Sequence, residues 1–320
     1  MNPVLARELK ERMRGLRAFI ALGIFLGLLT LTVWIVYKAN DLQNNNGFSF
    51  DLERQTRLGR ELFEWLMSIM LILLFFLVPG LTAGTISGER ERQTLTTLQL
   101  TLLRPRSIIW GKVQAAVVYL SLMIVAALPL FAVAYQLGGV SLTDALKGLG
   151  AVLLVGLMLA TMVASISAFA KRVQTATLLG YGFSALMAVS SFIGFGIASI
   201  VDGTRGVDDR NPPAVILTPN PLVFVADVTA GENVRIGSNP LRVIRGVVVD
   251  SYNRNESWLS RRASAPGFNQ NGNDGVFIDN GGNRHGFPAW VISLGSMTAL
   301  AGLLFCFACR RLRTPAEAER

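Results

Sequence analysis

The sequence predicts an all-α polytopic membrane protein with six transmembrane helices. Two observations lead to this class: six long stretches almost without charge, and a composition with 51% apolar but only 16% charged residues. A helix of about 20 apolar residues, at about 1.5 Å rise per residue, spans the roughly 30 Å hydrocarbon core of a bilayer. The stretches are Leu16–Tyr37 (interrupted only by Arg17), Trp65–Gly88, Val113–Thr143, Gly148–Ala170, Val173–Val201 and Gly286–Cys309.

A third observation, the distribution of charge, predicts the topology. The net charge is +9, and its excess lies in the short segments 1–17, 86–112, 170–175 and 310–320, whereas 38–61 and 202–288 are each neutral. Lys and Arg in short loops mark the cytoplasmic side of a membrane protein. We therefore expect both termini in the cytoplasm and a location in the cell membrane. Because the membrane topology accounts for the positive net charge, we expect no nucleic-acid partner.

The first elements are an interfacial helix and span 1. Residues 2–17 carry Leu5, Leu9 and Met13 at helical spacing among basic residues, which predicts an N-terminal amphipathic helix lying on the membrane surface. A solvated helical start is the alternative. Span 1, about 18–37, exceeds the roughly 7–15 apolar residues of a signal peptide, so we expect it to be an uncleaved span.

Spans 2 to 6 are predicted at about 65–86, 108–135, 146–170, 174–201 and 288–309. Pro79-Gly80 should kink span 2, Gly138 and Gly139 should form the turn after span 3, and Lys171-Arg172 should follow span 4 at the cytoplasmic side. The domains are then a membrane domain at 1–201, an extended extracytoplasmic loop or small cap at 202–287, and span 6 with a cytoplasmic tail at 288–320. Apolar pieces in the first part of the loop predict an ordered cap or short membrane-dipping helices. Its Asn- and Gly-rich second part predicts a flexible tract.

Small residues recur at a spacing of three to four in several spans. Such stripes let helix backbones approach closely in lipid. We expect them to pack within the chain, and a dimer interface is the alternative. The members are Gly23 and Gly27 in span 1, Gly156, Ala160, Ala164 and Ala168 in span 4, Gly180, Ser184, Ala188 and Ser191 in span 5, and Gly295, Ala299 and Gly302 in span 6.

The sequence offers little for catalysis. It has no G-x-x-x-x-G-K-[ST] phosphate loop and one histidine, His285, so neither ATP hydrolysis by that loop nor a multi-histidine metal site is expected. Glu64, at the edge of span 2, is interpreted as an interfacial anchor, and Cys306 and Cys309 as structural thiols with acylation or redox chemistry as alternatives. No catalytic residue, metal or bound cofactor is predicted. Work on a substrate would have to come from another subunit.

The segment between spans 2 and 3 is the most informative. Ser87 is placed to cap a helix, with Glu89 and Glu91 in its first turns. Leu95, Leu98 and Leu102 form one apolar face, and Pro105 ends the helix. An amphipathic helix at about 88–103, held between two spans, suits a cytoplasmic partner with an apolar groove. An interfacial helix without a partner is the alternative.

This segment resembles the cytoplasmic loop of ABC-2 type transporter permeases. The family has an acidic-basic cluster, a Thr-Leu-rich helix, a proline with a basic residue, and Gly-Lys at the next span. Here these are Glu89 to Arg92, Thr94-Leu95 with Leu98, Pro105-Arg106 and Gly111-Lys112, and Asn220-Pro221-Leu222 matches an Asn-Pro common after span 5. The sequence departs from the family at Gln93, where glycine is usual, and in the length of the 202–288 loop.

The resemblance implies a permease subunit that forms the translocation path, most often for export. Its partners would be a separately encoded ATP-binding cassette ATPase carrying ATP-Mg, a second permease copy or paralogue, and the lipid bilayer. A non-transport scaffold or signalling subunit that senses through its outer loop, or a membrane-embedded enzyme, are the rival classes. The residues expected to couple to the ATPase are Glu89, Arg90, Glu91, Arg92, Thr94, Leu95, Leu98, Leu102, Pro105 and Lys112.

Overall fold

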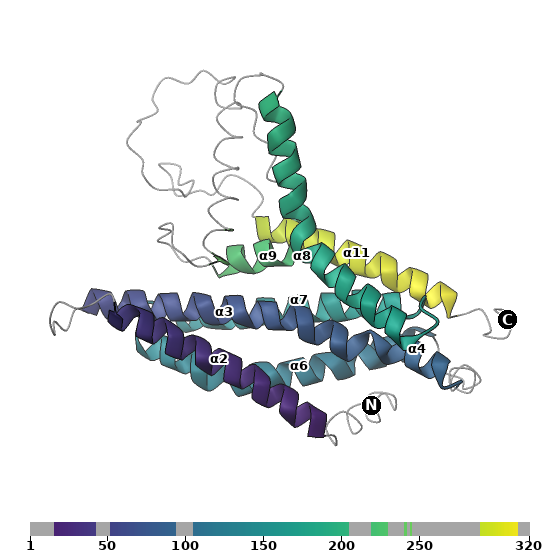
Figure 1. The fold of residues 1–320 in the computed structure, drawn as a ribbon, viewed down its shortest axis with the longest axis horizontal. Helices are drawn as coiled ribbons and strands as arrows, with labels where there is room; N and C mark the ends of the chain where they lie inside the picture. The colour runs from purple at the N-terminus through teal and green to yellow at the C-terminus, as the bar shows by residue number, and fades with distance from the viewer. Residues whose placement is uncertain are drawn as a thin grey trace. The chain divides into compact units, whose positions relative to one another are not determined.

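The described part of the chain is helical and contains no strand, as predicted. A computed structural model describes residues 16–42, 52–93, 105–204, 219–229, 240–241, 244 and 289–312. The interfacial helix with Leu5, Leu9 and Met13 lies outside these residues, as does the Asn- and Gly-rich tract. The helices labelled in Figure 1 are α2 (Leu16–Leu42), α3 (Leu52–Thr82), α4 (Gly84–Glu91), α6 (Pro105–Gln136), α7 (Leu142–Ser167), α8 (Val173–Thr204), α9 (Pro221–Val228) and α11 (Ala289–Arg311).

Five helical stretches in this described part are long and apolar enough to cross a membrane, so the chain is a helical membrane protein. They match predicted spans 1, 2, 3, 4 and 6. Predicted span 5 falls in α8, a single helix of 32 residues, and its crossing of the membrane remains a prediction. The five stretches are Phe19–Asp41, Arg54–Glu91, Arg106–Gln136, Leu142–Ser167 and Trp290–Arg311.

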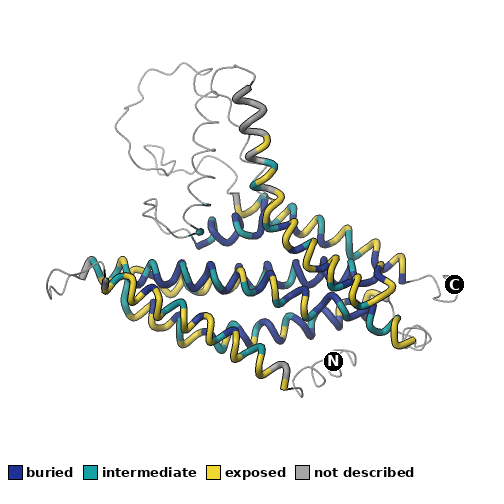
Figure 2. Tube along the Cα trace, viewed as in Figure 1, coloured by how far each residue is buried: buried dark blue, intermediate teal, exposed yellow. Residues whose placement is uncertain are grey.

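The exposed surface of α2 is largely apolar, as expected for a helix that faces lipid. α2 buries Phe25, Leu29 and Val36, while Figure 2 shows exposed residues along much of the helix. A helix on a water-soluble protein would place polar groups on that face, and a large exposed apolar surface suits a membrane. The large apolar residues exposed on α2 are Leu16, Phe19, Ile20, Ile24, Leu28, Leu31, Trp34, Ile35 and Tyr37.

The chain forms two compact units, residues 1–185 with 298–320, and residues 186–297. In the first unit α7 is central, because it packs on α3, α4 and α6. In the most apolar 18 residues of α7, 67% of the residues are buried, whereas only 17% are buried in the most apolar 18 residues of α2.

The small-residue stripes divide into buried and exposed ones. In span 4, Gly156, Ala160, Ala164 and Ala168 are all buried, which confirms packing within the chain for this stripe. A Cβ on Gly156 would lie 3.1 Å from Leu120 and 3.2 Å from Leu74. By contrast, Gly23 and Gly27 of α2 are exposed, as are Gly295, Ala299 and Gly302 of α11.

The end of α3 near Leu52 packs closely against the turn between α6 and α7. A Cβ on Gly59 would lie against the carbonyl oxygens of Gly138 and Ala134. Gly138 and Gly139 have φ values of 84° and 78°, a left-handed conformation that glycine adopts without steric cost. The predicted turn is therefore confirmed.

The helix after this turn starts earlier than predicted. The hydroxyl of Ser141 accepts a hydrogen bond from the backbone N–H of Asp144 at 3.1 Å. This cap starts α7 at Leu142 rather than near residue 146.

Glu64, interpreted from the sequence as an interfacial anchor, is buried among the described helices. Its carboxylate accepts a hydrogen bond from Arg60 Nε at 3.0 Å, one turn earlier on α3, and 9% of its side chain is exposed. The adjacent Phe63 packs edge-to-face on Phe131 of α6, with ring centroids 5.9 Å apart. The guanidinium compensates the carboxylate, which lets a charged group remain buried.

In the second unit, α9 is a short buried helix within the first part of the 202–288 loop. Asn220 starts it: its side-chain oxygen accepts from Leu222 N–H at 2.7 Å, and its amide donates to the carbonyl of Ala188 in α8 at 2.9 Å. At the other end, the Asp227 carboxylate accepts from Trp290 N–H at the start of α11 at 2.9 Å. α9 therefore connects α8 with α11 through its two ends.

Candidate functional site

The candidate site begins where α3 gives way to α4. α3 continues past Pro79-Gly80 to Thr82, and Ala83 N–H donates to Pro79 O at 2.9 Å. The break falls at Ala83. There the hydroxyl of Thr85 donates to the carbonyl of Thr82 at 2.7 Å, and the hydroxyl of Ser87 donates to the carbonyl of Ala83 at 3.3 Å. Side-chain hydroxyls thus bind two backbone carbonyls where α3 ends and α4 begins.

Ser167 of α7 supplies the acceptor that the start of α4 needs. Its hydroxyl oxygen accepts from the backbone N–H groups of Ile86 and Ser87, at 3.2 and 3.1 Å, and lies 3.3 Å from the Ser87 hydroxyl. The first N–H groups of a helix have no partner within the helix. The prediction that Ser87 is the N-cap is therefore wrong. Ser87 lies inside α4, where the N-cap position is Ala83, and the cap comes from another helix.

A buried ion pair joins α4 to α6. Lys112 Nζ lies 3.3 Å from Glu89 Oε1, and the two side chains are 4% and 19% exposed. An ion pair shielded from water in this way is costly to break, since the remaining charge stays where water cannot fully solvate it. The pair therefore fixes the end of α4 against the first turns of α6.

The next two charged residues of α4 bind the segment that joins α7 to α8. Arg90 donates to the carbonyl of Ala170 at 3.1 Å. The Glu91 carboxylate accepts from Val173 N–H at 3.1 Å, which places a negative charge at the positive end of α8. We call the set Ser87, Glu89, Arg90, Glu91, Ser167, Lys112, Ala170 and Val173 the α4 junction.

The coupling helix expected at about 88–103 lies mostly outside the described residues, and its first residues fall in α4 and the turn after it. α4 begins at Gly84 and ends at Glu91, so Glu89 and Glu91 lie in its last turn, and the prediction that they lie in its first turns is wrong. Arg92 N–H donates to Gly88 O at 3.1 Å, and Gln93 follows with φ 58°. Such a left-handed residue ends a helix.

The remaining predicted coupling residues divide into two groups. Thr94, Leu95, Leu98 and Leu102 lie outside the described residues. Pro105, expected to end the preceding helix, is the first residue of α6. Proline suits this position, because the first N–H of a helix has no partner within the helix. Arg92 is exposed at the end of α4.

We expect position 93 to tolerate glycine and to reject a β-branched residue. Gln93→Gly should retain stability, whereas Gln93→Val should lose roughly 1–2 kcal/mol, because a branched side chain meets the backbone in the left-handed region. Thermal unfolding of the two variants in one detergent checks this. Equal stability of both variants would contradict the strained conformation.

The α4 junction links α4 to α6, to α7 and to the start of α8. Within the described ranges, no group of three or more His, Cys, Asp or Glu could hold a metal ion. Cys306 is exposed and Cys309 is buried, and neither of these two described cysteines is in a disulfide. Sequence reasoning found Glu89, Arg90, Glu91 and Lys112, which the structure brings together with their partners. It missed Ser167, because a serine at the end of an apolar span carries no local signal of a partner more than 80 residues away.

A comparison with known proteins adds no family to this description: no protein-family model matches the chain, and no curated protein matches it.

Proposed function

We propose that the chain is the membrane-spanning permease subunit of an ABC-2 type transporter that works in export and is driven by a separate ATPase. The α4 junction carries this proposal. Three consecutive charged residues of α4 bind three different parts of the chain. Glu89 pairs with Lys112 of α6, Arg90 donates to the Ala170 carbonyl after α7, and Glu91 accepts from Val173 N–H at the start of α8. A displacement of α4 would therefore act on three long helices at once.

The mechanism follows from which parts are tied together. ATP-driven closure of the ATPase dimer pushes the segment after α4, where Leu95, Leu98 and Leu102 are predicted to form an apolar ridge that binds the ATPase. The N-terminal helix with Leu5, Leu9 and Met13 is the second contact. Because Lys112 and Glu89 are largely shielded from water, their ion pair transmits the displacement of α4 to α6. Tilting of the long helices then opens the path for substrate.

The conformation of Gln93 supports the resemblance on which this proposal draws. The permease family usually has glycine at this place, and here the residue has φ 58°, a conformation that favours glycine. The departure at Gln93 therefore preserves a backbone shape for which glycine is the usual choice.

The proposed topology has six spans, with α8 as the fifth, and both termini in the cytoplasm of a cell-membrane protein. Aromatic residues at the helix ends support the placement in a bilayer. Exposed Trp34, Tyr37 and Tyr135 lie near the ends of α2 and α6, and exposed Trp110 lies near the other end of α6. Trp and Tyr prefer the two membrane–water interfaces. A second permease copy or paralogue would complete the transporter.

The test is copurification of the full chain with an ATP-binding cassette ATPase encoded beside it. Leu95→Asp combined with Leu98→Asp should weaken association by about tenfold or more, since charges would replace apolar anchors. Thr97→Asp, on another predicted face of the helix, is the matched control. Unchanged association and unchanged ATP turnover in the double variant would refute the coupling role.

A scaffold or signalling subunit is the second candidate, and α9 is the observation that favours it. Because Asn220 and Asp227 bind α8 and α11, a change in the outer loop would reach both helices. The copurified complex separates the two functions. A transporter stimulates ATP turnover when substrate is added, whereas a scaffold leaves that turnover unchanged.

A further inference from the structure

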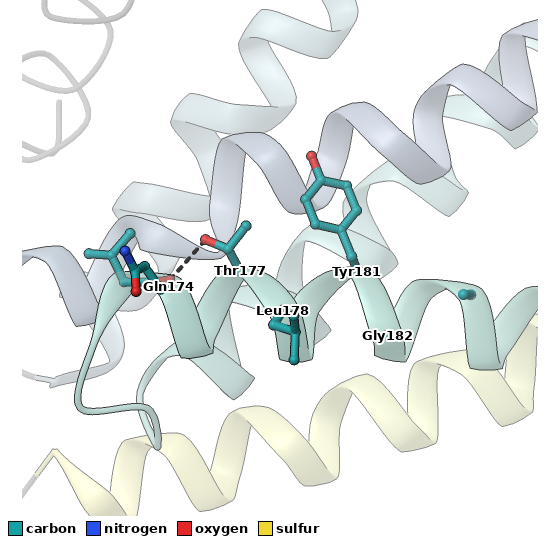
Figure 3. A pocket seen from close by; sticks show the side chains of 7 residues that line it. Gln174, Thr177, Leu178, Tyr181 and Gly182 are labelled. Carbon is teal, nitrogen blue, oxygen red and sulfur yellow. Dashed lines mark hydrogen bonds between the residues drawn. The ribbon is translucent and has the colours of Figure 1, made fainter.

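An apolar hollow lies along one face of α8, in its first part. It is shallow and broadly open, and its lining residues, all from α8, recur every three or four positions from Val173 to Ala185 (Figure 3). Gln174 lies near one end, and Leu178, with 77% of its surface exposed, lies in the middle. None of these lining residues belongs to the α4 charge contacts except Val173, whose N–H binds Glu91.

The hollow exists because two positions leave space and the polar groups of the wall are turned elsewhere. A Cβ on Gly182 would meet nothing within 4 Å. Tyr181 leans toward α3, since a Cβ on Gly80 would lie 3.0 Å from its hydroxyl. The Thr177 hydroxyl donates to the Val173 carbonyl at 2.9 Å, which Figure 3 shows as a dashed line. The surface left open is therefore mainly carbon.

The length of the hollow matches one leaflet of a bilayer. From Val173 to Ala185 a helix rises about 18 Å, at about 1.5 Å per residue. One leaflet contributes about half of the roughly 30 Å hydrocarbon core. A single acyl chain lying beside α8 would therefore have the hollow as its wall from the surface to near the bilayer centre.

The charge at the Val173 end indicates which head group such a chain would carry. Lys171 and Arg172 are both exposed and directly precede α8. Glu91 is a carboxylate at this end too, but it is engaged with Val173 N–H. The two cations immediately precede the apolar wall, where the head group of such a chain would lie.

We propose that this hollow binds one anionic phospholipid, with an acyl chain along Leu178 and Gly182 and its phosphate at Lys171 and Arg172. The inference goes beyond the proposed function. It requires that α8 lie in the membrane and needs no ATPase, so each can fail without the other. The binding would also place a lipid directly beside the α4 junction, at the start of α8.

The test measures phospholipid retained by the full chain after purification in mild detergent from vesicles of phosphatidylcholine and phosphatidylglycerol. Gly182→Leu adds an apolar side chain at a position where a Cβ would meet nothing within 4 Å, so it should occupy the hollow and lower the phosphatidylglycerol retained per chain. Gly150→Leu is the matched control, because Gly150 is also a helical glycine, on α7, with nothing within 4 Å of its Cβ. It should retain as much lipid as the wild type.

A second variant tests the head group. Lys171→Gln with Arg172→Gln should weaken the preference for phosphatidylglycerol over phosphatidylcholine by about tenfold, since each basic residue near the surface attracts anionic lipid. Equal retention in Gly182→Leu and wild type would overturn the proposal. So would efficient disulfide crosslinking of two Leu178→Cys chains lacking Cys306 and Cys309, because a second copy would then cover the hollow.

Discussion

Lys112→Met is expected to destabilise the chain by about 3–5 kcal/mol, because it removes the ammonium group that lies 3.3 Å from the partly buried Glu89 carboxylate. The Lys112 side chain is only 4% exposed, and Glu89 is 19% exposed, so water cannot fully replace the lost ammonium group. Thermal unfolding of the purified chain in detergent measures the loss. Replacing both residues, as Glu89→Met with Lys112→Met, should restore most of the stability, since no unpaired charge remains.

The matched control is the exposed pair of Lys38 and Asp41. These side chains are 53% and 66% exposed at a separation of 3.8 Å, and exposed pairs contribute about 0–1 kcal/mol. Lys38→Met should therefore change stability little. If Lys112→Met proved as mild as Lys38→Met, the ion pair between α4 and α6 would not be the firm connection that the proposed mechanism needs.

Ser167→Ala is expected to release the start of α4 from α7. The backbone N–H groups of Ile86 and Ser87 would lose the oxygen that accepts from both. An unsatisfied buried donor costs about 1–3 kcal/mol. Hydrogen exchange of the amides in 84–91 should therefore rise strongly, along with a drop in the unfolding temperature of the whole chain.

Ser165→Ala is the control for this variant, two residues earlier on the same helix. Ser165 is as fully buried as Ser167, but its hydroxyl donates only to the carbonyl of Thr161 at 2.6 Å, within α7. Its loss should leave exchange in α4 unchanged. Equal exchange in the two variants would show that Ser167 does not hold α4.

The helices were largely predictable because their signal is local. A run of apolar residues without charge cannot stay in water and must satisfy its backbone within itself once in lipid. Ends were less predictable, as α7 shows: Ser141 and Asp144 extend it beyond the apolar stretch. In the same way, the charges of Glu89 and Glu91 suggested the first turns of a helix, whereas these residues make their contacts from the last turn of α4.

The sequence by itself determined a helical membrane protein, and five of its apolar stretches form helices long enough to cross a membrane. It also indicated Glu89, Arg90, Glu91 and Lys112 as site residues. Tertiary structure alone decided what these residues hold. Glu89 binds Lys112, 23 positions away, and Glu91 binds Val173, 82 positions away. Such partners depend on which helices lie side by side, and the packing of helices around α7 determines those neighbours. The hydrophobicity of the sequence indicates only that a segment is buried in lipid or in protein.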